Sequence, residues 1–369
     1  MRRDFDYTLD DNFIVVVDPY RDRRNGIMLV TNPVRARADL QIFNNGASTN
    51  AFWNGVWDVK TTVNSEGWFA EFEIPLYTFK YRVGLEEQEW GINFERNIRH
   101  KREQIRWKGW ARDHRIEQMN LAGALRGLNR LSQKQMVEIK PYALGGGEFK
   151  PDQRRPVGTM GADVNYLLNP TYRLNLTINT DFAQVEVDER QVNLTRFNQL
   201  FPEKREFFLE GRGSFDLSQV RGLEVPTMFF SRRIGLEQGQ IVPIEAGARL
   251  TGKVGNYEIA ALTINTDAED FPTLESTGFS VLRVKRDVFS RSTVGVMLTD
   301  RSESLVGKGS SQLYAVDGAF DFLEDFSFDT YLAKTDSPNL KNDNQSYMAN
   351  VAYDSDLYGL NTGYLVVEN

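Results

Sequence analysis

The stretch Ala248–Thr263 (ARLTGKVGNYEIAALT) contains the pattern that decides the fold. Apolar and polar residues alternate before and after Gly255-Asn256, a dipeptide whose backbone freedom suits a tight hairpin turn. Alternation with a period of two places apolar side chains on one face of a strand. The stretch therefore predicts two antiparallel strands joined by a short turn.

The same arrangement recurs elsewhere between residues 166 and 366. Between the hairpins, the connections 265–277, 300–311 and 334–345 are longer and polar. Short turns that alternate with long loops, on strands of about ten residues, are typical of an outer-membrane β-barrel. A soluble β-sandwich shares the alternation but gives no reason for two such regular loop lengths. The other predicted hairpins are Tyr166–Leu168 with Tyr172–Ile178, Phe279–Arg286 with Ser292–Thr299, Leu313–Phe322 with Phe326–Ala333, and Tyr347–Tyr353 with Tyr358–Val366.

Aromatic residues flank the short turns, as in the girdle of a barrel at one membrane interface. Polar residues occupy the other face of several strands and are expected to line the lumen, among them Arg249, Thr251, Lys253, Asp317, Asp321 and Asp329. The pattern gives about eleven spanning strands. Because bacterial single-chain barrels usually have an even number of strands, we expect the sequence to be incomplete at its C-terminus.

Residues 180–242 interrupt this regular pattern. The front half of Gln191–Glu210 predicts a short helix that stops before Pro202. If Thr227–Arg232 were a spanning strand, Gly255-Asn256 would fall on the opposite side from the other short turns. We therefore predict one plug-like insertion whose charges pair within a polar lumen. The proposed charge network comprises Glu203, Lys204, Arg205, Arg232 and Arg233.

The first segment, residues 1–132, predicts an antiparallel β-sandwich, which makes the whole chain all-β. Short strand-like runs are separated by turn signals at close spacing, such as Asp22–Gly26 (DRRNG). Residues 1–140 contain 22 basic and 19 acidic residues, whereas the rest of the chain is strongly acidic. This shift places a domain boundary near Ser132–Val137, between domains 1–132 and 133–369. The expected strands are Asn12–Asp18, Ile27–Val30, Trp57–Val63, Trp68–Ile74 and Trp90–Asn97.

All six tryptophans lie in the first segment. An exposed indole could stack on a sugar ring, and Trp53 and Trp57 are the candidates for carbohydrate binding. Trp53 is the best candidate for exposure because it sits in a polar, Asn-rich stretch. For any single tryptophan, however, the core is the favoured position, since tryptophan buries a large apolar area.

Two further features of the first segment have both a functional and a structural interpretation. Asp18 and Asp22 flank a turn and could supply oxygen ligands to calcium, but aspartates in turns more often accept hydrogen bonds from their own backbone. Calcium is the only cofactor that the sequence suggests. The basic run Glu95–Arg115 could track a phosphate backbone or an acidic glycan. We favour a solvated strand pair with cross-strand ion pairs.

Composition excludes several classes of protein. The 369 residues have a net charge of -7, which argues against nucleic acid as a partner. The absence of cysteine excludes a disulfide scaffold, a thiolate metal site and a cysteine nucleophile. No apolar run is long enough for a membrane-spanning helix. The acidic residues after Met1 do not fit a signal peptide, so either the protein is cytoplasmic or the numbering begins downstream of the true start.

The strings FPEKREFFLE, within Asp181–Phe215, and FFSRRIG, Phe229–Gly235, are distinctive. They resemble an uncharacterised family of bacterial outer-membrane proteins, in which a domain like carbohydrate-binding-module family 9 precedes a barrel of unknown function. The resemblance implies a location in the outer membrane with the N-terminal domain in the periplasm. It implies a signal peptide and an earlier part of the sandwich, of which this sequence has little. It brings no catalytic residues.

The leading hypothesis is a non-enzymatic outer-membrane protein that binds or passes a glycan or related solute, or scaffolds an envelope complex. Its expected partners are that solute, outer-membrane lipid and other envelope protein chains. One alternative is a polysaccharide hydrolase with paired carboxylates, Glu71 with Glu73 or Glu186 with Asp188. Another is a structural subunit whose barrel edge is completed by another chain.

Overall fold

The computed structural model shows an all-β protein built around two antiparallel sheets. In the part of the chain that it describes, no helix combines the length and the apolar character needed to cross a membrane. The described residues are 3–109, 111, 114–131, 135–150, 153–180, 203–217, 225–237, 240–268, 275–289, 291–322, 325–340, 342–355 and 357–368.

The first sheet has seven strands, in the order β4-β3-β2-β1-β7-β8 with β9 also paired to β7. Its central strands are the apolar runs NFIVVVD and GIMLVT, and almost every side chain in them is buried. Continuous apolar runs of this kind mark strands that are covered on both faces. The strands are β1 (Asn12–Asp18), β2 (Gly26–Thr31), β3 (Arg37–Phe43), β4 (Ser48–Asn50), β7 (Glu87–Ile98), β8 (Glu103–Arg106) and β9 (Gly123–Asn129).

Each face of this sheet has its own core. On one face, Val15, Val17 and Leu29 pack with Trp53, Trp57 and Trp90 beneath a hairpin of β5 (Asp58–Asn64) and β6 (Gly67–Glu73). On the other face, Val16 and Met28 pack around Met119 of the short helix η4 (Met119–Leu121). The predicted strands of this segment all form, and β1 pairs with β2 across the predicted turn.

The second sheet has eleven strands that pair in chain order, as in an up-and-down barrel wall. The predicted strand number and the five predicted hairpins are therefore confirmed. Strands β10 and β22 are the two edges of the sheet. The strands are β10 (Met136–Lys150), β11 (Gln153–Leu167), β12 (Tyr172–Ile178), β15 (Ile244–Val254), β16 (Tyr257–Thr266), β17 (Thr277–Val288), β18 (Ser292–Arg301), β19 (Ser311–Phe322), β20 (Phe326–Asp336), β21 (Gln345–Asp354) and β22 (Gly359–Val367).

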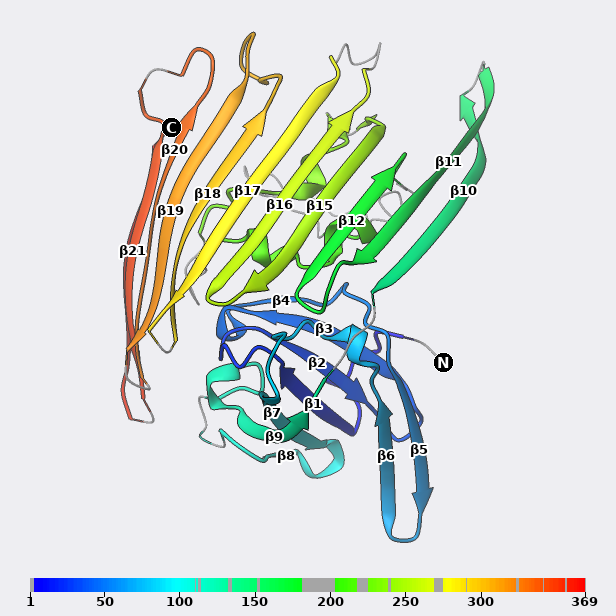
Figure 1. The fold of residues 1–369 in the computed structure, drawn as a ribbon, viewed down its shortest axis with the longest axis vertical. Helices are drawn as coiled ribbons and strands as arrows, with labels where there is room; N and C mark the ends of the chain where they lie inside the picture. The colour runs from blue at the N-terminus through cyan, green and yellow to red at the C-terminus, as the bar shows by residue number, and fades with distance from the viewer. Residues whose placement is uncertain are drawn as a thin grey trace.

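The first sheet lies against the end of the second sheet that carries the short turns (Figure 1). Tyr81 donates its backbone N–H to the carbonyl of Pro170, in the turn between β11 and β12. Arg24 donates from Nη1 to the carbonyl of Arg291, in the turn between β17 and β18, at 2.9 Å. The long connections are at the far end of the strands (Figure 1).

The two faces of the eleven-stranded sheet differ in chemistry. The inner face, which contacts the insertion, contains buried polar residues, and the outer face contains exposed apolar ones. In β17, for example, Leu282 is exposed between buried Val281 and Arg283. The buried polar residues include Asn175, Arg249, Thr251, Lys253, Arg283, Lys285 and Asn350. The exposed apolar residues include Val137, Ile139, Leu176, Ile178, Val254, Leu282, Val294, Val296, Leu298, Val316 and Leu332.

Strand β12 pairs directly with β15, so the described part of residues 180–242 adds no strand to the second sheet, as predicted. Phe207, Phe208 and Phe215 from the insertion pack against inward-facing apolar residues of β15 to β21. The predicted helix before Pro202 lies outside the described residues. The described part contains the single turn α1 (Glu206–Leu209), the short helices η5 (Arg212–Phe215) and η6 (Ser231–Arg233), and the small strands β13 (Leu236–Glu237) and β14 (Gln240–Ile241).

Candidate functional site

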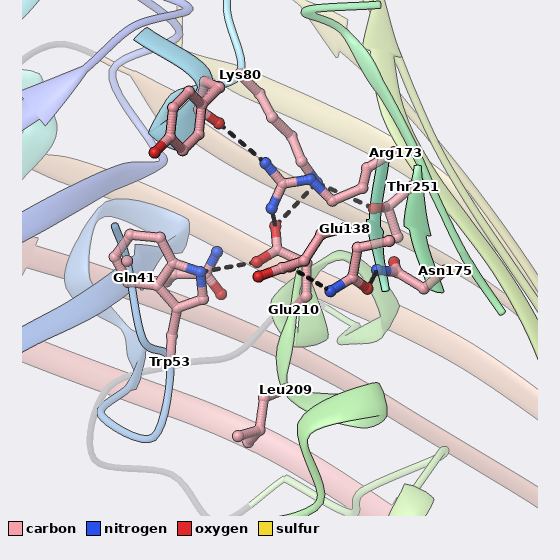
Figure 2. A network of polar contacts seen from close by, with 12 residues as sticks. Gln41, Trp53, Lys80, Glu138, Arg173, Asn175, Leu209, Glu210 and Thr251 are labelled. Carbon is pink, nitrogen blue, oxygen red and sulfur yellow. Dashed lines mark hydrogen bonds and ion pairs between the residues drawn. The ribbon is translucent and has the colours of Figure 1, made fainter. Parts of the chain in front are cut away.

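The carboxylate of Glu210 joins the first segment, the insertion and the second sheet at one point (Figure 2). The indole Nε1 of Trp53 donates to Glu210 Oε2 at 2.8 Å. The guanidinium of Arg173 lies 2.9 Å from Oε1, and the Lys80 ammonium lies 3.4 Å from the same oxygen. We call Trp53, Lys80, Arg173 and Glu210 the Glu210 junction.

Local structure explains how these side chains meet. Glu210 follows the single turn α1, and the chain then reverses at Gly211, whose φ of 65° suits glycine. Arg173 projects from the inner face of β12, in phase with buried Asn175. Lys80 follows the short helix η2 (Leu76–Thr78) and also donates to Thr251 Oγ1 at 3.0 Å. Each partner therefore comes from a different part of the chain.

A backbone contact supports the junction from the side of the insertion. Asn50, at the end of β4, donates from Nδ2 to the carbonyl of Leu209 at 2.8 Å. Asn50 is buried, so this hydrogen bond fixes the end of α1 against the first sheet. Nearby, Gly213 lies so close to the Phe43 ring that a Cβ there would clash with it. The insertion is thus fitted to the first sheet as well as to the second.

Burial and neighbouring charges shift the pKa values of two residues at the junction. Burial opposes ionisation of Glu210, but the charges of Arg173, Lys80 and Arg249 outweigh it and hold the pKa of Glu210 at about 2. Burial lowers the pKa of Lys80 to about 8, although the charge of Glu210 opposes this shift. An ionised, hydrogen-bonded carboxylate is a poor general acid near neutral pH. The junction is therefore suited to holding elements together.

A small pocket of about 120 Å³ opens beside the junction. The inner faces of β10, β11 and β12 line it with charged and amide side chains from Glu138, Lys140, Asp163, Asn165 and Asn175, and Trp53 and Glu210 form the other side. Asn165 donates to Glu138 Oε2 at 2.9 Å. The pocket is therefore lined by the same polar residue types as the rest of the inner face.

The predicted charge network of the insertion has Glu203 and Arg205 at its centre. Both side chains are fully buried, and Arg205 Nη2 lies 2.8 Å from Glu203 Oε2. Arg205 also donates to the carbonyls of Ser231 and Ile234 at 2.9 and 2.7 Å. The Ser231 hydroxyl donates to Glu203 at 2.8 Å. Burial opposes ionisation of Glu203, but Arg205 and these donors hold its pKa below the ordinary value.

The other predicted members of this network lie around that centre. The backbone N–H of Lys204 donates to Glu203 Oε1 at 3.1 Å. Arg232 is buried in the short helix η6, directly after Ser231, and Arg233 is exposed. The pair of Glu203 and Arg205 therefore joins the FPEKR and FFSRRIG strings through Ser231.

Asp18 and Asp22 accept hydrogen bonds from their own turn. Asp18 accepts from the backbone N–H of Arg23 at 2.8 Å, and Asp22 accepts from that of Arg24 at 2.9 Å. Asp22 also lies 2.8 Å from the ammonium of Lys253 on β15, so this turn is tied to the second sheet. Burial and the charge of Asp22 raise the pKa of Asp18 to about 8. Among the described residues, no three His, Cys, Asp or Glu side chains group as a metal site.

The exposure that we expected for Trp53 is wrong. Trp53 and Trp57 are each only 4% exposed. The indole of Trp57 stacks on Phe72 with ring centroids 5.7 Å apart, and that of Trp53 is engaged at the junction. The Asn-rich stretch around Trp53 suggested a surface loop, and Phe52 and Asn54 are indeed exposed, but the Trp53 side chain turns inward to Glu210. Neither indole presents an open face for a sugar ring in this structure.

The carboxylate pair Glu71 and Glu73 is exposed on the β5–β6 hairpin. Glycoside hydrolysis requires two carboxylates that face each other across a cleft. These two lie on one strand and do not. Glu186 and Asp188 lie outside the described residues. In the basic run, β7 pairs with β8, and Arg106 forms an ion pair with buried Glu95. This cross-strand ion pair is the structural role that we favoured for the run.

The sequence singled out neither Lys80 nor Glu210 as a site residue. Strand alternation places Arg173 on the inner face, because it is in phase with Asn175. Nothing in the sequence pairs Lys80 or Trp53 with a residue more than one hundred positions away. The junction depends on how the two sheets and the insertion dock.

Comparison with known proteins finds a family match for part of the chain. Residues 136–254 match a domain of unknown function (DUF5916). This range covers the first strands of the second sheet and the insertion, so it supports the barrel half of the resemblance. The carbohydrate-module half stays a prediction.

The chain was also compared with curated proteins and with solved structures. No curated protein matches the chain. Among solved structures, the outer membrane channel DcaP of Acinetobacter baumannii aligns over 96% of this chain and 88% of its own. The identity is 10% and the TM-score is 0.31. At these values the likeness carries no functional argument.

Proposed function

We propose that the protein is a bacterial outer-membrane β-barrel protein with a periplasmic N-terminal domain and a lumen that the insertion fills. The observation that carries this proposal is the inverted polarity of the eleven-stranded sheet. Its outer face exposes apolar side chains along most strands, and its inner face buries charged ones. A sheet in water has the opposite arrangement, because burying apolar area drives folding. Lipid around the outer face accounts for both faces at once.

The orientation follows from the turns. Barrels of the outer membrane keep their short turns in the periplasm and their long loops outside the cell. The first segment contacts the short turns at Pro170 and Arg291, through Tyr81 and Arg24. This contact supports a periplasmic location for residues 1–131.

The finer part of the proposal is that the protein binds or passes a glycan or related solute and is not an enzyme. The amide and carboxylate side chains on the inner face are the groups that bind hydroxyls in protein sites. The ionised carboxylates at the centres of both networks are fixed by ion pairs and hydrogen bonds. They are therefore unsuited to acid–base chemistry.

Fractionation of cells that express the native protein tests the proposal. We expect the protein in the outer-membrane fraction, with a gel mobility that changes on boiling because a folded barrel resists detergent. External protease should spare residues 1–131 in intact cells and cleave them after the outer membrane is permeabilised. A water-soluble protein whose mobility does not change on boiling would overturn the proposal.

The two edges of the second sheet favour a further role in assembly. Unpaired edge strands are templates for another strand. In the described residues, β10 pairs only with β11 and β22 pairs only with β21. Pairing of these edges with strands of another envelope chain would make the protein a structural subunit. Cross-linking from single cysteines at Ala143 and Tyr364 would detect such a neighbour. Cross-links confined to a single chain would argue against it.

A further inference from the structure

A cavity of about 420 Å³ lies between loops of the first segment and the inner face of strands β19 to β22. It is separate from the Glu210 junction, which lies at β12 and β15 in the other half of the sheet. Its volume falls within the range of small-molecule sites. Small inward residues, Ala319, Ser327 and Ala352, leave the space open on the side of the second sheet.

Strand register arranges the polar residues of this wall in rows. Ala319, Asp329 and Asn350 pair across β19, β20 and β21. In the next row toward the short turns, Asp321, Ser327 and Ala352 pair in the same way. Carboxylate and amide groups therefore alternate with small side chains that leave room for a solute.

The opposite wall comes from loops of the first segment. Asn44 and Asn45 of the short helix η1 (Asn44–Gly46) line it together with His114, Gln118 and Asn120. Asn45 accepts a hydrogen bond from the backbone N–H of Asn120 at 3.1 Å, which holds the two loops together. Amides thus face the row of carboxylates across the cavity.

Three polar atoms around this cavity are buried and have no hydrogen-bond partner among the described residues: Asn350 Nδ2, Asn120 Oδ1 and His114 Nδ1. Asn350 is only 2% exposed and projects from the inner face of β21. Buried polar groups are nearly always paired in folded proteins. Partnerless groups from both walls of one cavity point to a ligand that supplies the missing partners.

The charge of the lining selects the class of ligand. Four aspartates line the cavity, Asp321, Asp325, Asp329 and Asp354, against the basic side chains Arg24 and His114. The Arg24 guanidinium lies 3.9 Å from Asp321, so it offsets part of this charge. The described acidic residues do not group closely enough to hold a metal ion. The surplus negative charge therefore suits a larger, organic cation.

We propose that this cavity binds a polyhydroxylated solute with an ammonium group, such as a short amino-sugar oligomer. The aspartates of β19 to β21 bind the ammonium, and the amides on both walls bind hydroxyls. This inference rests on the proposed function and names the solute class. The cavity lies at the short-turn end of the sheet, where a solute would meet both parts of the protein.

The test is isothermal titration calorimetry of the full chain, folded in a detergent without sugar groups. The probes are the disaccharide of glucosamine, its N,N′-diacetylated form and putrescine. The disaccharides have the same ring hydroxyls, but only the first is charged, and putrescine is charged without hydroxyls. The variants are Asp329→Asn and Asn350→Leu. Asp336→Asn is the matched control, because Asp336 is exposed on the same strand outside the cavity.

We expect saturable binding of the glucosamine disaccharide, at least about tenfold weaker binding of the other two probes, and at least about a tenfold loss in each cavity variant. Asp336→Asn should bind like the parent. Equal binding of the diacetylated form or of putrescine would overturn the proposal, as would no binding or unchanged binding in Asp329→Asn. The boiling-dependent gel shift of each variant separates failure of this site from failure of the barrel.

Discussion

The two sheets of this protein use apolar residues in opposite ways. In the first sheet, strands β1 and β2 are nearly continuous apolar runs, and the protein buries them on both faces. In the second sheet, apolar residues alternate with polar ones, and it is the apolar set that is exposed. The same residue types thus serve a protein core in one sheet and an external surface in the other.

The comparison shows that alternation does not by itself identify the buried face of a strand. The environment decides which set of side chains turns inward, because water and lipid favour opposite faces. In the second sheet, the buried set includes Arg249, Arg283 and Lys285, which would be costly to bury without partners. Their partners are Asn175 for Arg249 and Asp317 for Arg283, both in the second sheet, and the carbonyl of Gly213 in the insertion for Lys285.

The largest effect is expected from breaking the buried ion pair of the insertion. Arg205→Met leaves the fully buried Glu203 carboxylate without its main partner, which costs about 3–5 kcal/mol. We expect the described part of the insertion, residues 203–217, to become sensitive to limited proteolysis. Arg233→Met, at an exposed position, is the control and should change little. Equal protease resistance of both variants would contradict this role of the pair.

Truncation of a leucine to alanine should lower the free energy of unfolding by different amounts in the two sheets. Leu29 is fully buried in the first sheet, so Leu29→Ala should cost about 2–5 kcal/mol. Leu298 is on the outer face of the second sheet, where truncation loses burial in lipid but leaves no cavity, so Leu298→Ala should cost about 1–2 kcal/mol, less than Leu29→Ala. Urea unfolding in lipid vesicles measures both. Tryptophan fluorescence reports the first segment alone, because all six tryptophans lie there. A larger cost for Leu298→Ala would count against the comparison.

An arginine should be costly on the outer face of the second sheet and harmless on the water-exposed surface of the first segment. Val296, in the middle of β18, and Val63, on the β5–β6 hairpin, are both exposed valines. Arginine at a lipid-facing position near the bilayer midplane costs about 2–4 kcal/mol. A surface substitution in water typically changes stability by less than about 0.5 kcal/mol. We therefore expect Val296→Arg, and not Val63→Arg, to reduce the boiling-sensitive folded form in outer membranes.

The smallest effect is the pH dependence of the Glu210 junction. The pKa of Glu210 is about 2 in the folded protein and about 4.3 in an unfolded chain. Because the folded value is lower, its stabilising contribution is present above about pH 4.3 and is lost as the pH falls toward 2. Trp53→Phe removes one donor to Glu210 and should shift this loss to higher pH. Trp57→Phe is the matched control, and an identical acid profile for the two variants would show that Glu210 does not depend on Trp53.

The sequence was sufficient to predict most of the second sheet. The Gly255-Asn256 turn, the alternation around it and the difference in loop length fixed the hairpins, the strand number and the position of the insertion. The charged string predicted that Glu203 and Arg205 belong to a charge network, but not that they pair with each other. The contact of Trp53 with Glu210 and the role of Lys80 could not be predicted, because both depend on Glu210 approaching from another part of the chain. Local composition made the surroundings of Trp53 look like a surface loop.

The account depends most on the claim that lipid covers the outer face of the second sheet. The chain has no natural cysteine, so single-cysteine variants can each carry one fluorescent label. The informative positions are Val296 and Val316 on the outer face and Val63 on the β5–β6 hairpin. In membranes that contain brominated lipid, the account predicts strong quenching of labels at Val296 and Val316 and none at Val63. Labels at Val296 and Val316 that remain unquenched and react freely with a water-soluble reagent would contradict it.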